Sequence, residues 1–451
     1  MNEPFRLKGL TLKNRVLRSS LGGQLCAPNG AVTDMWTNFE SRFARSGVAA
    51  LVSATVSVSG RRYAPLHYPN LASDAHVERL RRALHTVKSN PRAGDCAYIL
   101  QIGDPGYHTQ TSLFPQAADA KSASFVFDFL YGYSDHAVAM TAHDIDEVVA
   151  AYAAGARRAR AAGCDGLEVT ASKGYLLQQF LSPITNRRDD AYGGTREKRF
   201  HLLERIVRAV RDEVGPDYLF GVRISVEDAP YWPVNLRVPL RSFFGNRLDD
   251  TLWFAERLER LGVDYLHLSN GFGFINPTES PGDFPLAEVR RVYNATRHLG
   301  TKARLRSTLM NLVPTPIAQR AFSLGWGTRG GARLGMTGEQ ARKLRGVVKI
   351  PLIANGGFQN RSLIEETLAS GACDLVSMAR PLLANPDLFD ALQKADSPPK
   401  PCIFCNRCSV LTAIVPVGCY EPKRFADQDE MERQILSFTS DPDAPSPNLP
   451  D

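Results

Sequence analysis

The sequence lacks any apolar run long enough to span a membrane, because charged residues interrupt every hydrophobic stretch before about 20 residues. Its first residues, "MNEPFRLKGLTLKNR", have no apolar stretch behind their charges, which argues against a secretory signal. The net charge is +7, but Arg and Lys alternate with Asp and Glu instead of clustering. A nucleic-acid surface needs such clustering, and no nucleic-acid-binding motif is present. These absences predict a cytoplasmic protein without a membrane or nucleic-acid partner.

Cysteine is sparse, with eight residues in the chain, and half of them stand alone. Three of these isolated cysteines border apolar segments, which is typical of buried structural thiols. The other four form a C-x₂-C-x₂-C-x₁₀-C pattern made by Cys402, Cys405, Cys408 and Cys419. In a reducing compartment such a group indicates metal or redox chemistry. Four thiolates at this spacing can bind zinc or a cubane iron–sulfur cluster, and free thiols are a third alternative.

What the sequence does contain is a regular alternation of short apolar runs and longer helical patterns. The predicted strands are residues 14–20, 48–56, 96–103, 166–172, 218–225, 265–270, 349–357 and 373–380. Because most of these runs lack a strict polar alternation, they suit strands buried on both faces of a parallel sheet. They predict an α/β fold, a (β/α)₈ TIM barrel with inserted βα loops and a short Cys-rich C-terminal extension. A doubly wound sheet is the alternative, since periodicity does not reveal closure.

Polar side chains gather at or just beyond the carboxyl ends of the predicted strands. In a barrel these ends meet at one face, where active sites are built. The residues are Gln101, Thr170, Lys173, Tyr175, Arg223, His267 and Arg380. Gly356 and Gly357 directly follow one strand and Arg380 ends the next, a pairing that suits a bound phosphate. Taken singly, each charged residue could instead form a structural ion pair.

The segment 166–194, "GLEVTASKGYLLQQFLSPITNRRDDAYGG", resembles the central signature of the old yellow enzyme family of FMN-dependent NAD(P)H:flavin oxidoreductases. "LKNRVLRSS", "LQIG", "GVRIS", "PLIANGGF" and "MARPLLANPDL" follow in that family's order. The resemblance implies a TIM barrel with non-covalent FMN at its mouth and NAD(P)H as the reductant. It places the isoalloxazine against Ser20, Leu21 and Ala54, its pyrimidine edge at Gln101, and Arg223 near flavin N1 and O2. The phosphate would be held by Gly356, Gly357, Ala379 and Arg380.

The departures from the family pattern fall on the substrate side. The family's strand ends in His-x-x-His or His-x-x-Asn, whereas Thr170 and Lys173 occupy those positions here and Tyr175 is retained. The family's "QLxHxGR" is "QIGDPGY" in this sequence, which puts Asp104 and Tyr107 in place of His and Arg. The resemblance therefore implies a retained cofactor and a changed substrate, with Tyr175 as proton donor and with Lys173 and Thr170 orienting the substrate.

The predicted function is an FMN-dependent, ene-reductase-like oxidoreductase that transfers hydride between flavin N5 and a small unsaturated substrate. The Lys173 ammonium would hold a carboxylate or a developing oxyanion, so the substrate could be anionic. The alternative is a catalytically decayed flavoprotein that acts in electron transfer or redox sensing. In that case Lys173 would reach solvent or pair with Asp104.

The four-cysteine group resembles the segment in the multidomain branch of the family, where a 4Fe–4S cluster passes electrons to FMN. That branch continues into FAD- and nucleotide-binding domains, and no strand–GxGxxG–helix unit is visible here. The resemblance implies an electron-donor protein for a cluster, or NAD(P)H docking directly over FMN. The expected organisation is a barrel over 1–398, a Cys-rich segment over 399–425 packed on it, and a helical or disordered tail over 426–451. Self-association of the chain is a further expectation.

Overall fold

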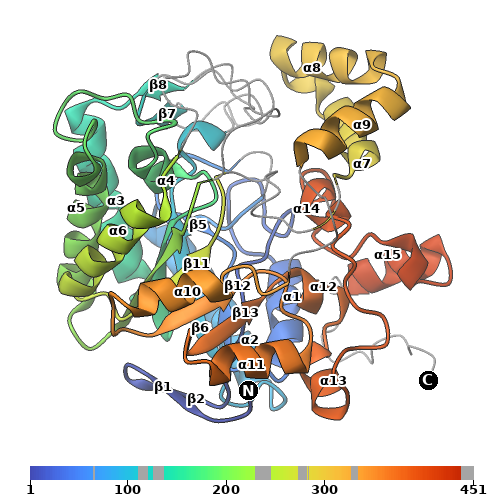
Figure 1. The fold of residues 1–451 in the computed structure, drawn as a ribbon, viewed down its shortest axis with the longest axis horizontal. Coiled ribbons are helices and arrows are strands. Elements are labelled where there is room, and N and C mark those ends of the chain that lie inside the picture. The colour runs from blue at the N-terminus through green and yellow to red at the C-terminus, as the bar shows by residue number, and fades with distance from the viewer. Residues whose placement is uncertain are drawn as a thin grey trace.

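The computed structural model describes residues 1–63, 67–109, 120–124, 137–228, 245–272, 282, 284–326 and 334–437, without the side chains of 321–326. Its centre is a parallel barrel (Figure 1). Around the barrel the strands are β3 (Val16–Arg18), β4 (Ala50–Val52), β6 (Ala97–Gly103), β9 (Gly166–Ala171), β10 (Leu219–Ser225), β11 (Tyr265–Ser269), β12 (Leu352–Asn355) and β13 (Leu375–Met378). Strand β4 pairs with both β3 and β6, which closes the ring. Closure confirms the predicted TIM barrel and excludes the doubly wound alternative, whose sheet is open.

Several strands are shorter than the sequence predicts, and the second one is interrupted. The predicted strand 48–56 is observed as β4 and, after a break, β5 (Val56–Ser57). In the break the Gln101 backbone N–H donates to Ser53 Oγ at 2.9 Å, so a hydroxyl takes the place of a ladder carbonyl. The chain can therefore turn toward the barrel mouth without leaving this buried N–H unsatisfied.

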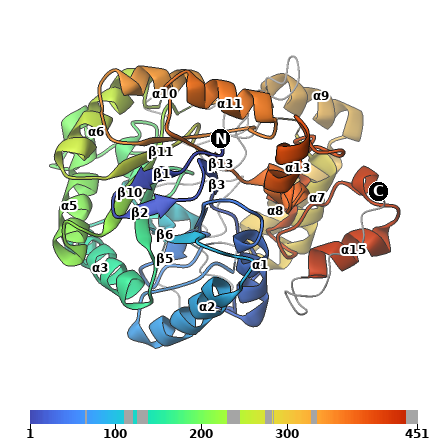
Figure 2. The same ribbon diagram turned by 90° about the horizontal axis from the view of Figure 1, so that it is seen from below.

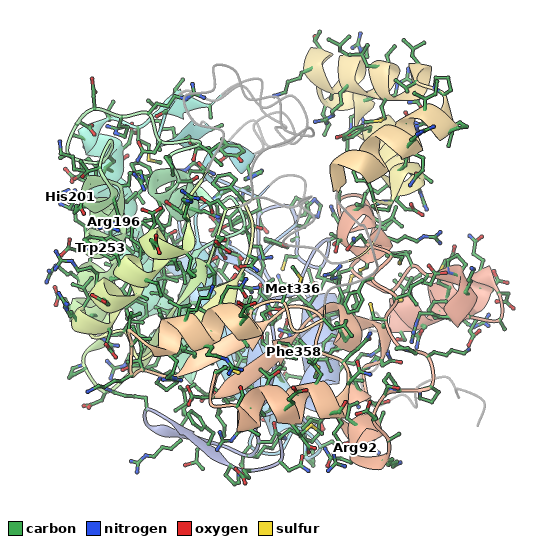
Figure 3. All side chains as sticks on the ribbon, viewed as in Figure 1. Arg92, Arg196, His201, Trp253, Met336 and Phe358 are labelled. Carbon is green, nitrogen blue, oxygen red and sulfur yellow. The ribbon has the colours of Figure 1, made fainter. Side chains whose placement is uncertain are left out.

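Helices surround the strands (Figure 2). They are α1 (Asp34–Ala44), α2 (Val77–Ser89), α3 (Ala142–Ala161), α5 (Arg196–Val214), α6 (Leu248–Arg260), α10 (Gly338–Arg345) and α11 (Arg361–Ala369). Helix α3 begins with a capping box, in which the Thr141 and Asp144 side chains each accept from the other's backbone N–H. Its side chains Ile145, Val148 and Tyr152 are buried in the main core. On the outer surface the Arg196 guanidinium lies 5.1 Å from the Trp253 ring centre, joining α5 to α6 (Figure 3).

A short antiparallel hairpin closes the barrel at the amino ends of its strands. Its strands are β1 (Phe5–Leu7) and β2 (Leu10–Leu12). Leu7 and Leu12 are fully buried and pack with Leu17, Ile99 and Tyr265 in the lower core. Figure 1 shows the hairpin beneath the barrel. Ligands therefore have to reach the barrel interior from the opposite, carboxyl end.

Further elements lie outside the barrel ring. After β11 the chain forms α7 (Leu286–Ala295), α8 (Thr301–Leu312) and α9 (Thr315–Trp326), which project at the upper right of Figure 1. Short pieces at and near the mouth are α4 (Leu176–Leu181) and the paired β7 (Lys121–Ser122) and β8 (Val138–Ala139). After β13 come α12 (Arg380–Ala384), α13 (Leu388–Lys394), α14 (Arg407–Leu411) and α15 (Gln428–Leu436). None of the described helices is long and apolar enough to cross a bilayer.

The backbone of the Cys-rich segment forms hydrogen bonds with residues of the barrel. The Gln359 side chain, which follows β12, donates to the Cys402 carbonyl at 3.0 Å and accepts from the Cys402 N–H at 2.9 Å. Further along, the Val417 N–H donates to the Gly23 carbonyl at 3.1 Å. The predicted tail 426–451 contains helix α15, and its part beyond residue 437 lies outside the described residues.

Candidate active site

A cavity of about 270 Å³ opens at the carboxyl ends of the barrel strands. It brings together most of the residues that the sequence predicts for the site. Those in its lining are Ser20, Leu21, Gln101, Lys173, Tyr175, Arg223, Gly356, Gly357, Ala379 and Arg380. Met336 and Phe358, labelled in Figure 3, complete the wall beside the two glycines.

Three predicted residues lie outside this lining, and one of them, His267, is fully buried beneath the cavity. Thr170 is fully buried, and its hydroxyl lies 3.3 Å from Ser172 Oγ. Ala54 lies behind Gly22, where an added Cβ would come within 2.4 Å of the Ala54 Cβ. Thr170 and Ala54 therefore support the wall of the cavity from behind.

The cavity is electropositive. Lys173, Arg223 and Arg380 line it, and the described part of the lining contains no Asp or Glu. Cationic groups in a partly enclosed, low-dielectric hollow attract anions much more strongly than they would in bulk water. The arrangement therefore favours a negatively charged cofactor, substrate or both.

The wall after β12 has the shape of an anion cradle. Gly356 and Gly357 have φ angles of 109° and 80°, in the region that favours glycine. A Cβ at Gly356 would also lie only 2.7 Å from the Met336 Cβ. Nearby, the Arg380 guanidinium lies 5.2 Å from the Phe404 ring centre and bonds to the Asn406 side chain. Open backbone and a guanidinium fixed in place are the donors that a phosphate group requires.

Below the cavity floor a polar chain crosses the barrel interior. The Glu168 carboxylate accepts from Gln101 Nε2 at 2.6 Å, from the Tyr265 hydroxyl at 3.1 Å and from His267 Nδ1 at 2.9 Å. His267 Nε2 lies 2.8 Å from Ser377 Oγ, which reaches the cavity wall. The chain fixes the orientation of Gln101, whose Oε1 accepts from Thr55 Oγ1 at 2.5 Å. The Gln101 amide is thus held in one orientation at the cavity floor.

The charges in this chain follow from its burial. Burial by itself would raise the pKa of Glu168, but the attraction and hydrogen bond of His267 and the charge of Arg223 hold the pKa below its ordinary value. Burial lowers the pKa of His267, and the Glu168 charge opposes that shift without reversing it. The Glu168 carboxylate is therefore ionised, and His267 Nδ1 carries the proton that it accepts.

The turn after β9 presents Lys173 and Tyr175 to the cavity. Lys173 has a φ of 63°, an uncommon conformation for a residue with a side chain, and Gly174 follows at 73°. The Gly174 N–H donates to Gln178 Oε1 at 2.7 Å, and the Tyr175 N–H donates to the Ser172 carbonyl at 3.2 Å. Tyr175 then begins helix α4 as its N-cap. Two left-handed residues in a row let the chain turn sharply enough for both side chains to line the cavity.

Aromatic side chains form the wall around Tyr175, and two of them, Tyr63 and Tyr68, are not among the residues predicted from the sequence. The Tyr63 ring centre lies 4.6 Å from that of Tyr175 and 5.3 Å from that of Tyr68, and His108 lies 6.0 Å from Tyr175. The two new tyrosines come from "GRRYAPLHYPN", the loop that follows β5. Aromatic residues in a loop at the carboxyl end of a barrel strand are the signal that would have identified them.

Asp104, which replaces a family histidine, has a structural partner. Its carboxylate accepts from Arg61 Nη2 at 2.6 Å and from Ser59 Oγ at 2.6 Å. Burial by itself would lower the pKa of Arg61. The charge and hydrogen bond of Asp104 have the larger combined effect, so the pKa of the guanidinium is raised. This buried pair ties the loop after β5 to the end of β6, and so positions Tyr63 two residues further on.

The four grouped cysteines line a second, smaller hollow beside the first. Arg380, Phe404 and Cys408 border both spaces. Burial, followed by the nearby Glu421 and the other thiols, raises the pKa of Cys405 to about 12, although its bond with the Arg407 backbone opposes the shift. No group of three or more His, Cys, Asp or Glu residues in the described ranges is arranged to bind a single metal ion. The predicted metal site stays a prediction.

A closed barrel with a cationic, glycine-bordered cavity at its carboxyl face is the architecture of a phosphate-cofactor enzyme. The chain belongs to the NADH:flavin oxidoreductase / NADH oxidase family, whose sequence profile matches residues 1–235 and 327–397. This match confirms the old yellow enzyme resemblance.

Two relatives and two structures illustrate the range of the family. Metal reductase of Desulforamulus reducens is 28% identical over 445 residues, which are 97% of this chain and 55% of that protein. 4,4'-Dithiodibutanoate disulfide reductase of Rhodococcus erythropolis is 30% identical over 409 residues, 90% of this chain and 91% of that protein. The structure of the old yellow enzyme homologue from Zymomonas mobilis has a TM-score of 0.65 at 20% identity, and covers 94% of this chain and 98% of its own. The structure of 2-naphthoyl-CoA reductase has a TM-score of 0.69 at 20% identity, and the match covers 93% of this chain and 56% of the reductase chain. The chain thus spans about half the length of the first and last of these proteins.

Proposed function

We propose that this chain is an FMN-dependent oxidoreductase that reduces small unsaturated substrates carrying a carboxylate, with NAD(P)H as reductant. The observation that carries the proposal is a cavity with three cations, four phenols and no carboxylate in its described lining. An enzyme that binds a phosphorylated cofactor needs one of these cations for the phosphate and a second for negative charge on the flavin ring. Lys173, the third cation in the lining, is the residue that we propose contacts the substrate.

The cavity residues fit FMN. Gly356, Gly357 and Arg380 would hold the phosphate, and Gln101 would bond the pyrimidine edge of the ring. Arg223 would stabilise negative charge on that ring, and Ser20, Leu21 and Ala379 would contact the cofactor from the cavity wall. Bound FMN would supply the hydride that one carbon of the substrate double bond takes up.

Lys173 and Tyr175 have the side chains that a substrate carboxylate and its reduction require. The ammonium would hold the carboxylate, and the Tyr175 hydroxyl would give a proton to the second carbon of the double bond. Since Thr170 lies outside the lining, we propose that it supports the wall and does not contact the substrate.

The first test is purification followed by FMN analysis and reoxidation of the reduced protein by crotonate or by cyclohexenone. The Lys173→Met variant should raise KM for crotonate about tenfold or more, as loss of a charged hydrogen bond predicts, and should leave KM for the uncharged enone unchanged. Lys198→Met, on the exposed face of α5, is the matched control. Equal effects on both substrates would contradict the role of Lys173. Reoxidation by oxygen faster than by any enone, enoate or nitro compound would favour the electron-transfer alternative.

For the four-cysteine group we propose a 4Fe–4S cluster that would exchange electrons with FMN bound in the cavity. The support is that the four thiols border one hollow, and that Cys408 and Phe404 also border the main cavity. Anaerobic purification with iron, sulfide and zinc analysis tests it, because zinc without iron would contradict the cluster. In this proposal residues 399–425 are a cluster segment on a barrel of residues 1–398. A protein electron donor and self-association stay predictions.

A further inference from the structure

The proton donor Tyr175 has a second phenol at its side. Tyr68 is hydrogen-bonded to Tyr175 through their side chains, and both line the cavity. Tyr63 packs edge-on to Tyr175 and at a tilt to Tyr68, which fixes the pair between the loop after β5 and the start of α4. Burial raises the pKa of Tyr68 to about 12, although the hydrogen bond with Tyr175 opposes the shift, so Tyr68 keeps its proton at neutral pH. Tyr68 is therefore able to donate to Tyr175.

Tyr68 also borders a third hollow, whose lining does not include Tyr175. This hollow has a volume of about 10 Å³ and is bordered by Ser57, Arg62, His67 and Asn70. A space of that size with several polar neighbours is just sufficient for one water molecule. His67 and Arg62 are only half-buried, so the hollow lies close to bulk solvent.

We propose that Tyr68 is the proton relay that restores Tyr175 after each turnover. This inference rests on the proposed function. When the Tyr175 O–H bond breaks and the proton forms a C–H bond on the substrate, a phenolate is left at Tyr175. The Tyr68 hydroxyl gives its proton to that oxygen, and water in the third hollow gives a proton to Tyr68. The proton count closes with one proton taken from solvent.

The relay is tested with the FMN-loaded protein and the Tyr68→Phe variant. With crotonate, kcat should fall about tenfold and its solvent deuterium isotope effect should rise, because reprotonation becomes slow. KM and FMN content should not change. Ferricyanide reduction should also be unaffected, since no carbon is protonated in that reaction.

A double variant separates a relay from a packing role. If Tyr68 acts only through Tyr175, Tyr68→Phe/Tyr175→Phe should be no slower than Tyr175→Phe alone, whereas a packing effect would add to it. Tyr98→Phe is the control for removal of a phenol away from the cavity. Tyr98 is in strand β6, and its ring packs against Trp36 of α1 with ring centres 6.2 Å apart. If Tyr68→Phe does not fold, His67→Gln should change kcat and the isotope effect in the same direction.

The outcomes distinguish the two proposals. Wild-type protein that reduces ferricyanide but neither crotonate nor enone would overturn the proposed function, and the relay with it. Wild-type protein that reduces crotonate while Tyr68→Phe keeps the same kcat and isotope effect would overturn the relay alone. Additive effects in the double variant would also overturn it.

Discussion

At the scale of single residues, Glu168 is the most constrained group below the active site. It is an ionised carboxylate with no exposed surface, and it accepts hydrogen bonds from Gln101, Tyr265 and His267. A buried charge is tolerable only when its partners satisfy it fully, and removal of one member leaves the others unpaired. The orientation of Gln101, and with it the cavity floor, therefore depends on a residue that no ligand touches.

Glu168→Gln should lower the free energy of unfolding by about 3 kcal/mol, because an amide cannot accept all three bonds and leaves Arg223 without its balancing charge. Urea unfolding measures the change. Glu78→Gln, which breaks exposed ion pairs with Arg81 and Arg82, should change the free energy of unfolding much less, because solvent screens those pairs. If Glu168→Gln lowered the free energy of unfolding as little as Glu78→Gln does, the assignment of a buried charge to Glu168 would be contradicted.

At the scale of elements, Asp228, just beyond the end of β10, joins α4 to the segment that begins α6. Its carboxylate accepts from Gln178 Nε2 of α4 at 2.6 Å and from the Asn246 N–H, just before α6, at 2.9 Å. Burial raises the pKa of Asp228 to about 6, and the hydrogen bonds to Asn246, Ser182 and Gln178 oppose that shift only in part. The junction of α4, β10 and α6 therefore contains a group that titrates close to neutral pH.

The sign of the resulting pH dependence follows from the two pKa values. In the unfolded chain Asp228 would titrate near about 4, below its folded value, so the folded state binds the proton more tightly. This contribution to stability is fully present below pH 4 and is lost as the pH rises through 6, by up to roughly 3 kcal/mol. Thermal unfolding of wild type and Asp228→Asn between pH 4 and 8 measures it. The difference in stability between the two proteins should change with pH, and a difference that stays constant between pH 4 and 8 would contradict the raised pKa of Asp228.

At the scale of the whole molecule, the barrel is stabilised by any ligand that binds only its folded mouth. FMN at one hundred times its dissociation constant should raise the free energy of unfolding by about 2.7 kcal/mol. Riboflavin, which lacks the phosphate, should give a smaller increase, and Arg380→Met should reduce the difference between the two ligands. Thermal unfolding with each ligand measures the effect. Equal stabilisation by FMN and riboflavin would contradict the phosphate site at Gly356, Gly357 and Arg380.

Much of this architecture could be predicted from the sequence because buried parallel strands leave a plain signal of apolar runs and glycine turns. Strand-end residues such as Arg223 and Lys173 were expected at the mouth, and they line the cavity. Strand lengths were overestimated because apolar runs continue into the turns. The Tyr63 and Tyr68 wall was missed because those residues come from a loop, and the placement of a loop depends on distant contacts such as Arg61 with Asp104. Thr170 belongs to the same strand-end pattern, but its buried side chain is not part of the cavity lining.

The hairpin of β1 and β2 has a kinetic consequence. Because the hairpin closes one end of the barrel, the nicotinamide cofactor and the substrate to be reduced would both enter from the opposite end. Each would have to dissociate before the other binds, which gives ping-pong kinetics. Double-reciprocal plots at several fixed nicotinamide concentrations should then be parallel, and intersecting lines would mean that both partners occupy the mouth together.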